Sequence, residues 1–355
     1  MMKARFAILC LALLLTACSG RDAREPFTDS RIPPNLGPAD WPPDGWTWGL
    51  VQAGKDPAQR YGMAGPADVS RGQVLILPGY GQAAEDEYRL ARSLIAHRFE
   101  VWVLDGAGQG GSGRQTGTRD LGQVDDFKGD LATIGAMIDK AIPSDAEGPL
   151  ILVAASTAAP LALRRLQQGG KITGVVLLAP TDTGPTQAAP LPTAPMVQWA
   201  RRVGLGRMRA AGQKGWTSTA PEIGADPAPQ THRAWRAANP DLRMGGPSYD
   251  WLAAYRALNA DVARTGLNGI AVPALLLRSA NSTKRDASYD DHLCRALPRC
   301  VQARFEDQGE ADQKVVSFAE TLAVQGLVTP KGLLFPSPSP RASLTGPRPR
   351  RGARE

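Results

Sequence analysis

Short apolar runs recur along the chain between residues 46 and 307, and segments with helical periodicity separate them. The runs that predict strands cover residues 46–52, 73–79, 99–106, 150–156, 174–180, 273–280 and 301–307. Several of them are continuous Val, Ile and Leu stretches, which are typical of strands buried on both faces of a parallel sheet. Their alternation with helices predicts an α/β fold with a doubly wound, mostly parallel sheet. In such a sheet, ligands bind at the carboxyl ends of the strands.

The helical segments also show where the regular alternation stops. Residues 86–98 and 124–140 have the periodicity of amphipathic helices. In the second of these segments, four apolar residues line one face: Phe127, Leu131, Ile134 and Ile138. From Thr181 to about Asn268 the pattern gives way to Trp-containing helices interrupted by Pro and Gly. Because this stretch lies between two predicted core strands, it predicts an inserted helical cap over the sheet edge.

The first 18 residues have the pattern of an export signal. Lys3 and Arg5 precede an apolar run over residues 6–15, which is too short to span a bilayer. The ending "LTAC" resembles the lipobox of bacterial lipoproteins. This resemblance implies that residues 1–17 are removed and that Cys18 carries lipid such as palmitate. A plain secretory signal is the alternative. Ser19 follows the cysteine in place of the aspartate that often marks inner-membrane retention, which implies an outer-membrane protein facing the periplasm.

Composition divides the remainder into a tether, a folded body and a tail. Residues 18–45 are rich in Pro and polar residues and predict a lipidated tether. The folded domain is expected over residues 46–330, with the cap at about 181–268. The Pro- and Arg-rich residues 331–355 predict a disordered basic tail, which either contacts acidic lipid or polysaccharide or is only a solvated end. Most of the net charge of +7 lies in the leader and the tail. The near-neutral body therefore argues against a nucleic-acid partner.

Four cysteines are present, and two of them lie in the folded body. Cys294 and Cys300 are close in sequence, and in an oxidising periplasm they are expected to form a disulfide. Two free buried thiols are the alternative. A metal site is not expected, because no third or fourth ligand stands nearby. No cofactor-binding motif stands out either, so we expect no cofactor.

Three motifs in order along the chain resemble those of one enzyme family. They are "LPGYGQAAEDEYRLARSLIAHRFEVWVLDGAGQGGSGR" (residues 77–114), "DDFKGDL" (125–131) and "NPDLRMGGPSYDWLAAY" (239–255). Together they are similar to α/β-hydrolases of the lysophospholipase and monoglyceride-lipase type, within the serine aminopeptidase-like group. The resemblance covers roughly residues 45–325. It implies a sheet of the α/β-hydrolase type with an inserted helical cap.

The same resemblance identifies a candidate nucleophile, Ser156, in the segment "VAASTAAP". In this fold the nucleophile sits on a sharp strand-to-helix turn flanked by small residues. Ala154 and Ala158 stand at the flanking positions, where glycine is usual. The resemblance implies that the backbone N–H groups of Thr157 and Tyr80 form an oxyanion hole.

The other members of a catalytic triad are missing from their expected positions. The family resemblance implies a carboxylate after the seventh strand and a histidine after the eighth. The first position reads Asn281, Ser282 and Thr283, and the second falls near Glu310. Without an adjacent base, a serine hydroxyl is a weak nucleophile.

Only a few other residues are candidates for the missing roles. Among the three histidines, His97 is expected at the far edge of the sheet, His292 lies well along a helix, and His232 of the cap can swing toward the pocket. Glu310 is a poor base, because the ordinary pKa of a glutamate is about 4.3. Asp182, just after the 174–180 strand, is a candidate relocated acid.

Three hypotheses about function follow. The first is a membrane-anchored pseudoenzyme of the hydrolase fold, without activity or weakly active, whose capped pocket binds an acyl chain or lysophospholipid. The second is an active serine esterase or lysophospholipase that uses Ser156 with an unusual base. The third is an envelope interaction protein that uses its tether and basic tail.

Overall fold

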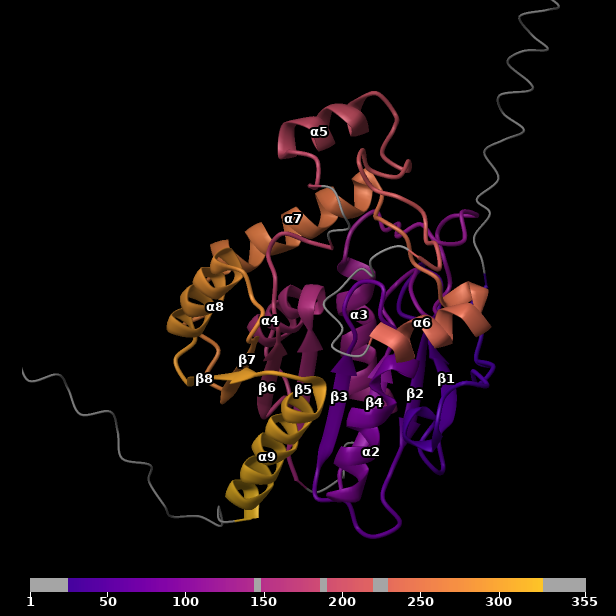
Figure 1. Cartoon of the computed structure of the whole chain (residues 1–355). Coiled ribbons are helices and arrows are strands. Elements are labelled where there is room, and N and C mark those ends of the chain that lie inside the picture. The colour runs from indigo at the N-terminus through magenta and orange to yellow at the C-terminus, as the bar shows by residue number, and fades with distance from the viewer. Residues whose placement is uncertain (1–24, 144–147, 186–189, 220–228, 328–355) are drawn as a thin grey trace, which may run out of the picture.

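A central eight-stranded sheet organises the molecule in the computed structural model, which describes residues 25–143, 148–185, 190–219 and 229–327. The strand order is β1-β2-β4-β3-β5-β6-β7-β8 (Figure 1). The strands are β1 (Thr47–Val51), β2 (Gln59–Ala64), β3 (Gln73–Leu77), β4 (Glu100–Leu104), β5 (Leu150–Ala155), β6 (Gly174–Leu178), β7 (Ala274–Ser279) and β8 (Cys300–Phe305). Only β2 runs antiparallel to its two neighbours. The predicted doubly wound, mostly parallel sheet is confirmed.

Helices cover both faces of this sheet. The α-helices of the described residues are α2 (Tyr88–Ala96), α3 (Lys128–Ala136), α4 (Ala159–Gln167), α5 (Ala194–Arg202), α6 (Pro229–Ala238), α7 (Tyr249–Thr265), α8 (Lys284–Ala296) and α9 (Gln308–Leu327). Helices α3, α4, α7 and α8 pack on one face, and α2 and α9 pack on the other (Figure 1). The short helix η2 (Ala84–Glu87) leads into α2.

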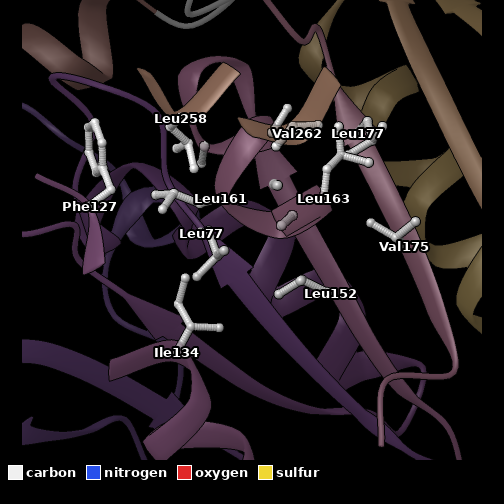
Figure 2. Close-up of a cluster of buried hydrophobic side chains, with 14 of the residues drawn as sticks. Leu77, Phe127, Ile134, Leu152, Leu161, Leu163, Val175, Leu177, Leu258 and Val262 are labelled. Carbon is white, nitrogen blue, oxygen red and sulfur yellow. The ribbon is translucent and has the colours of Figure 1, made fainter. Parts of the chain in front are cut away.

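Alternate residues of each central strand enter two different cores. Leu75 and Leu77 of β3 pack in the core beneath α3 and α4, whereas Val74 and Ile76 pack in the core beneath α2 and α9. Figure 2 shows part of the first core, where Leu77 lies among side chains from the neighbouring strands and helices. Burial on both faces is why these strands read as unbroken apolar runs in the sequence.

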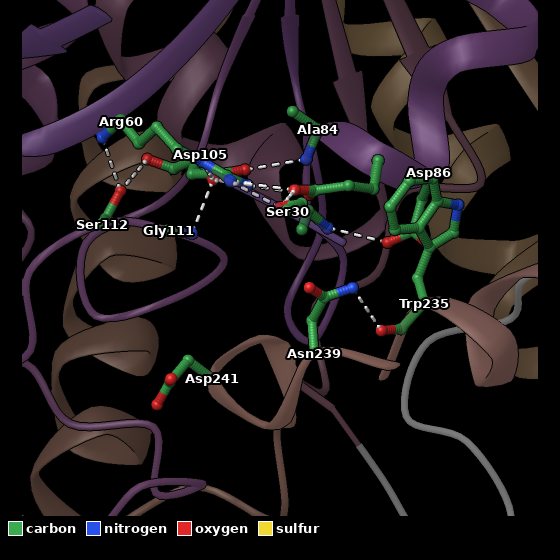
Figure 3. A network of polar contacts seen from close by, with 12 residues as sticks. Ser30, Arg60, Ala84, Asp86, Asp105, Gly111, Ser112, Trp235, Asn239 and Asp241 are labelled. Atoms are coloured by element: carbon green, nitrogen blue, oxygen red, sulfur yellow. Dashed lines mark hydrogen bonds and ion pairs between the residues drawn. The ribbon is translucent and has the colours of Figure 1, made fainter. Parts of the chain in front are cut away.

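Strand β2 was not predicted, because its buried positions are polar. Gln59 and Arg60 are both buried in it. The Arg60 guanidinium donates to Asp105 Oδ2 at 2.7 Å (Figure 3) and to Glu85 Oε2 at 2.7 Å. It also lies 4.1 Å over the ring of Trp48. Although burial acts to lower it, the two carboxylates raise the pKa of Arg60 above its ordinary value.

The segment expected to be a free tether packs against this network over its described part. The backbone N–H of Phe27 donates to Gly111 O at 2.9 Å, and Ser30 Oγ hydrogen bonds Glu85 Oε1. Phe27 also joins an apolar cluster around Tyr88 and the α6 residue Trp235. Residues 25–45 therefore belong to the folded body, because their apolar side chains pack against residues of α2 and α6 and Ser30 hydrogen bonds Glu85 of η2. Residues 18–24 lie outside the described residues.

The region of the predicted cap contains α5, α6 and α7, between β6 and β7. Helix α7 packs against α4, and its Leu258 and Val262 enter the core shown in Figure 2. Part of the insertion is therefore a member of the helical layer, whereas α5 lies beyond α7 at one end of the molecule (Figure 1).

The predicted disulfide is present. Cys294 of α8 is bonded to Cys300 at the start of β8, with a Cα–Cα distance of 5.3 Å. Within the described ranges, no helix is long and apolar enough to cross a membrane. The predicted signal (1–17), Cys18 and the tail (331–355) lie outside the described residues.

Candidate functional site

Ser156 occupies a sharp turn between β5 and α4. The strand ends at Ala155, and the next residue has φ +47°, a left-handed conformation that is uncommon for a residue with a side chain. A single 3-10 turn then leads into α4, whose first turn contains Pro160. Gly79 of the preceding loop approaches this turn closely, since a Cβ at that position would lie 3.1 Å from Ser156 Cβ, which is tighter than an ordinary contact. This is the geometry that the sequence predicts for a nucleophile elbow.

The neighbouring strand ends in the same unusual way. Ala179, directly after β6, has φ +44°. Both residues line two pockets at the carboxyl edge of the sheet. Such conformations cost on the order of 1–3 kcal/mol each and cluster at functional sites.

One of the two expected oxyanion donors is already engaged. The backbone N–H of Tyr80 donates to the hydroxyl oxygen of Thr157 at 2.7 Å, and both residues are buried. In an active hydrolase this N–H would point at the oxygen that becomes negative during the reaction. The phenol of Tyr80 donates to Gly245 O at 2.9 Å. Burial raises the pKa of this phenol, so the side chain is not an acid at neutral pH.

The Ser156 hydroxyl has no hydrogen-bond partner among the described residues, which include all three histidines of the chain. His232 of α6 is buried, and its Nδ1 lies 3.1 Å from Asp86 Oδ1. Arg236 Nη2 binds the other oxygen of the same carboxylate at 2.6 Å. Although burial acts to raise it, the charges of Arg236 and His232 hold the pKa of Asp86 below its ordinary value. His232 is thus tied to an ion pair and not to the serine.

The other two histidines are farther from candidate roles. His97 is exposed at the end of α2, before the amino end of β4, as predicted. His292 is exposed on α8.

The two candidate carboxylates are also occupied elsewhere. Glu310 Oε2 accepts the backbone N–H of Glu306 at 2.7 Å, and Glu310 Oε1 pairs with Lys314 at 2.9 Å. These contacts lower the pKa of Glu310, whereas a general base needs a raised pKa. Asp182 pairs with Arg285 at 3.6 Å. Neither carboxylate lines the pockets around Ser156.

Two pockets meet at Ser156. The first, the α2–α9 pocket, has a mixed lining of apolar and polar residues, and the polar ones include Gln82, Asp86, Glu87, Gln308 and Asp312. The second, the β6–β7 pocket, lies at the carboxyl ends of those strands, and its lining includes Thr181, Thr183, Ser279, Ser282, Asp286 and Asp290.

The positions expected for the missing triad members form ordinary helix starts. Thr283 caps α8, since its hydroxyl oxygen accepts the backbone N–H of Asp286 at 3.2 Å. On α9, Gln308 lines the α2–α9 pocket, and Glu310 does not. The sequence analysis missed Gln308 and the pocket residue Asp290. The spacing of Asp286 and Asp290, four residues apart on one helix face, was a usable indication for the second of these.

No group of three or more His, Cys, Asp or Glu side chains in the described ranges could hold a metal ion.

Comparison with known proteins gives one family and a set of similar structures. Residues 68–307 match the family described as serine aminopeptidase, S33. A soluble variant of monoglyceride lipase from Saccharomyces cerevisiae has 14% identity and a TM-score of 0.54, covering 79% of this chain and 97% of that one. Monoacylglycerol lipase from Paleococcus ferrophilus has 19% identity and a TM-score of 0.52, covering 73% and 98%.

A third structure, the carboxyl esterase from Bacillus coagulans, has 12% identity and a TM-score of 0.55, covering 78% of this chain and 99% of that one. No curated protein matches the chain. At these identities the structural likeness shows a shared fold.

Proposed function

Because the chain belongs to the serine aminopeptidase S33 family of α/β-hydrolases, we propose that it binds a small ligand beside Ser156 and hydrolyses it slowly or not at all. The observation that carries this proposal is the Ser156 hydroxyl, which no described base contacts. A serine hydroxyl keeps its proton at neutral pH unless a neighbouring group takes it. The scaffold of the nucleophile is present, but its activation is not.

The engaged N–H of Tyr80 supports the same proposal. Loss of one oxyanion donor typically lowers the rate of acyl transfer by about 100- to 1,000-fold. In this chain the Thr157 hydroxyl occupies one of the two donors before any substrate arrives. The missing base and the occupied donor act on the same step, so they leave little rate enhancement.

The ligand class is proposed from the family and from the neighbouring structures. Monoglyceride lipase and carboxyl esterase share the fold, and we propose an acyl compound with a polar head group, such as a lysophospholipid. Both pockets at Ser156 have polar side chains among their lining residues, and these side chains suit the head group.

One observation favours a second candidate, an active serine hydrolase. Ser156 keeps the left-handed backbone of a working elbow, although a passive turn residue has no need of that strain. The base would then be one of the carboxylates of the α2–α9 pocket, such as Asp312.

We also propose that the protein is anchored in the bacterial envelope through lipid on Cys18. The lipobox-like sequence supports this location. The Cys294–Cys300 disulfide supports an oxidising compartment such as the periplasm.

A fluorophosphonate probe separates the two candidate functions. The purified chain should show no labelling of Ser156 above the level of the Ser156→Ala variant, because an unactivated hydroxyl does not attack the probe. Turnover of p-nitrophenyl acetate should likewise be equal in the two proteins. Strong labelling or turnover that disappears in Ser156→Ala would establish an active hydrolase and refute the proposal.

A further inference from the structure

The β6–β7 pocket lies in the region where the family would place its catalytic acid. Its lining differs from that of the α2–α9 pocket. It contains hydroxyl side chains, small residues and two carboxylates, those of Asp286 and Asp290. No basic side chain of the described residues lines it. The pocket therefore favours a positively charged group over an anion.

Asp290 has one carboxylate oxygen to spare. Its side chain is 2% exposed, and its Oδ2 accepts from Arg278 Nε at 2.9 Å. The other oxygen, Oδ1, is buried and has no hydrogen-bond partner in the described part of the chain. A buried acceptor left without a donor costs on the order of 1–3 kcal/mol. A ligand that donates a hydrogen bond to Asp290 Oδ1 would therefore be favoured.

The neighbouring cation, Arg278, does not donate to Asp290 Oδ1. Arg278 Nη2 donates to the carbonyl of Ala287 at 2.8 Å and also to the carboxylate of Asp291. Burial raises the pKa of Asp290 to about 6, and the contact with Arg278 only partly opposes this rise. Above that pH the Asp290 carboxylate is ionised with one oxygen unmatched.

Hydroxyl groups surround the same space. The hydroxyls of Thr181 and Thr183 lie 3.0 Å apart, and each keeps further hydrogen-bonding capacity. The Ser282 side chain makes no hydrogen bond within the described residues. These groups can bind the hydroxyls of a ligand that reaches Asp290.

We propose that the β6–β7 pocket binds a head group with a primary ammonium and neighbouring hydroxyls, and that the ammonium donates to Asp290 Oδ1. This inference rests on the proposed ligand-binding function and names the ligand class for it. An ammonium is favoured over a neutral hydroxyl because a hydrogen bond between charged groups is roughly twice as strong as a neutral one.

A matched pair of probes tests the inference. In 2-amino-1,3-propanediol, an ammonium replaces the central hydroxyl of glycerol, and the rest of the molecule is unchanged. At pH 7.5 we expect the amine to bind about tenfold more tightly than glycerol, which corresponds to one charged hydrogen bond. Binding is measured by NMR titration of the purified chain.

Substitutions in the pocket locate the binding. Asp290→Asn should abolish the preference for the amine, and Asp291→Asn should retain it, because Asp291 also pairs with Arg278 but does not line the pocket. Ser282→Phe should weaken both probes by filling the space. This variant also serves if Asp290→Asn does not fold. Absence of binding, equal binding of both probes, a preference for the amine that survives Asp290→Asn, or undiminished binding of both probes by Ser282→Phe would overturn the inference.

The outcome can be separated from that of the proposed function. Ser156→Ala should keep the preference for the amine over glycerol, because the preference comes from the contact between the ammonium and Asp290, although Ser156 also lines the pocket. Ser156-dependent hydrolysis with intact amine selectivity would refute only the claim of weak activity. Loss of selectivity in a chain that hydrolyses nothing would refute only the ligand class.

Discussion

The Arg60 network and the surroundings of Ser156 lie in one domain and differ in how fully their polar groups are paired. Arg60 is buried between Glu85 and Asp105, and Asp105 accepts further backbone N–H groups from Ala84 and Gly111 (Figure 3). Around Ser156, the hydroxyl and Asp290 Oδ1 have no partners in the described chain. A buried group that is fully paired holds the fold, whereas one that is unpaired is available to a ligand.

This difference separates two kinds of polar burial that look alike in sequence. Both regions contain carboxylates close to strand ends, and both include residues with small exposed fractions. Only the hydrogen-bond partners distinguish them. The Thr157–Tyr80 contact belongs to the first kind although it lies beside Ser156, because it consumes a donor that catalysis would use.

The largest effect is expected from Arg60→Met. This substitution leaves Glu85 and Asp105 buried without their cation, and removal of one partner of a buried ion pair costs about 3–5 kcal/mol. The free energy of unfolding is measured by denaturant titration. Arg264→Met is the matched control, because the Arg264–Asp261 pair is exposed and should contribute less than about 1 kcal/mol. Equal losses in the two variants would show that the network is not structural.

A smaller loss is expected from Thr157→Val. The valine keeps the shape but removes the acceptor of the Tyr80 N–H, which costs about 1–3 kcal/mol. Thr157→Ser keeps the hydroxyl and should retain most of the stability. Thermal unfolding of the two variants measures the difference. If valine is tolerated as well as serine, the contact does not hold the turn, and the oxyanion donor is free in solution.

The smallest effect, with the opposite sign, is expected from Ser156→Gly. Glycine adopts a positive φ without strain, so this variant should gain about 1 kcal/mol of stability. Ser156→Ala keeps the Cβ and should remain close to the parent chain in the same unfolding measurement. A glycine variant no more stable than the alanine variant would mean that the turn is not strained.

The fold was predictable where burial is apolar. The runs that became β3, β5 and β6 are buried on both faces, so their sequences contain the whole pattern. Strand β2 escaped prediction because ion pairing, rather than apolar side chains, allows its Arg60 to be buried. The packing of residues 25–45 escaped for a similar reason, since Pro-rich sequence with scattered aromatic residues does not reveal which surface it covers.

The candidate site was predictable only at its centre. The turn at Ser156 follows from a local strand-to-helix sequence, and the structure has that turn. The surroundings depend on distant segments. His232 was a candidate base, and its contact with Asp86 brings together residues 146 positions apart. Gln308 and Glu310 differ by half a turn of one helix, and no local pattern reveals which of them faces the pocket.

The packing of the N-terminal segment against the domain limits the distance between the domain and a membrane to which Cys18 would be attached. If Cys18 carries lipid as proposed, only the nine residues from Ser19 to Phe27 separate the bilayer from the first hydrogen bond of the domain. A fully extended chain of that length reaches about 30 Å. The domain would then stay close to the membrane surface, where molecules that leave the bilayer could reach it. It would not move through the whole periplasm.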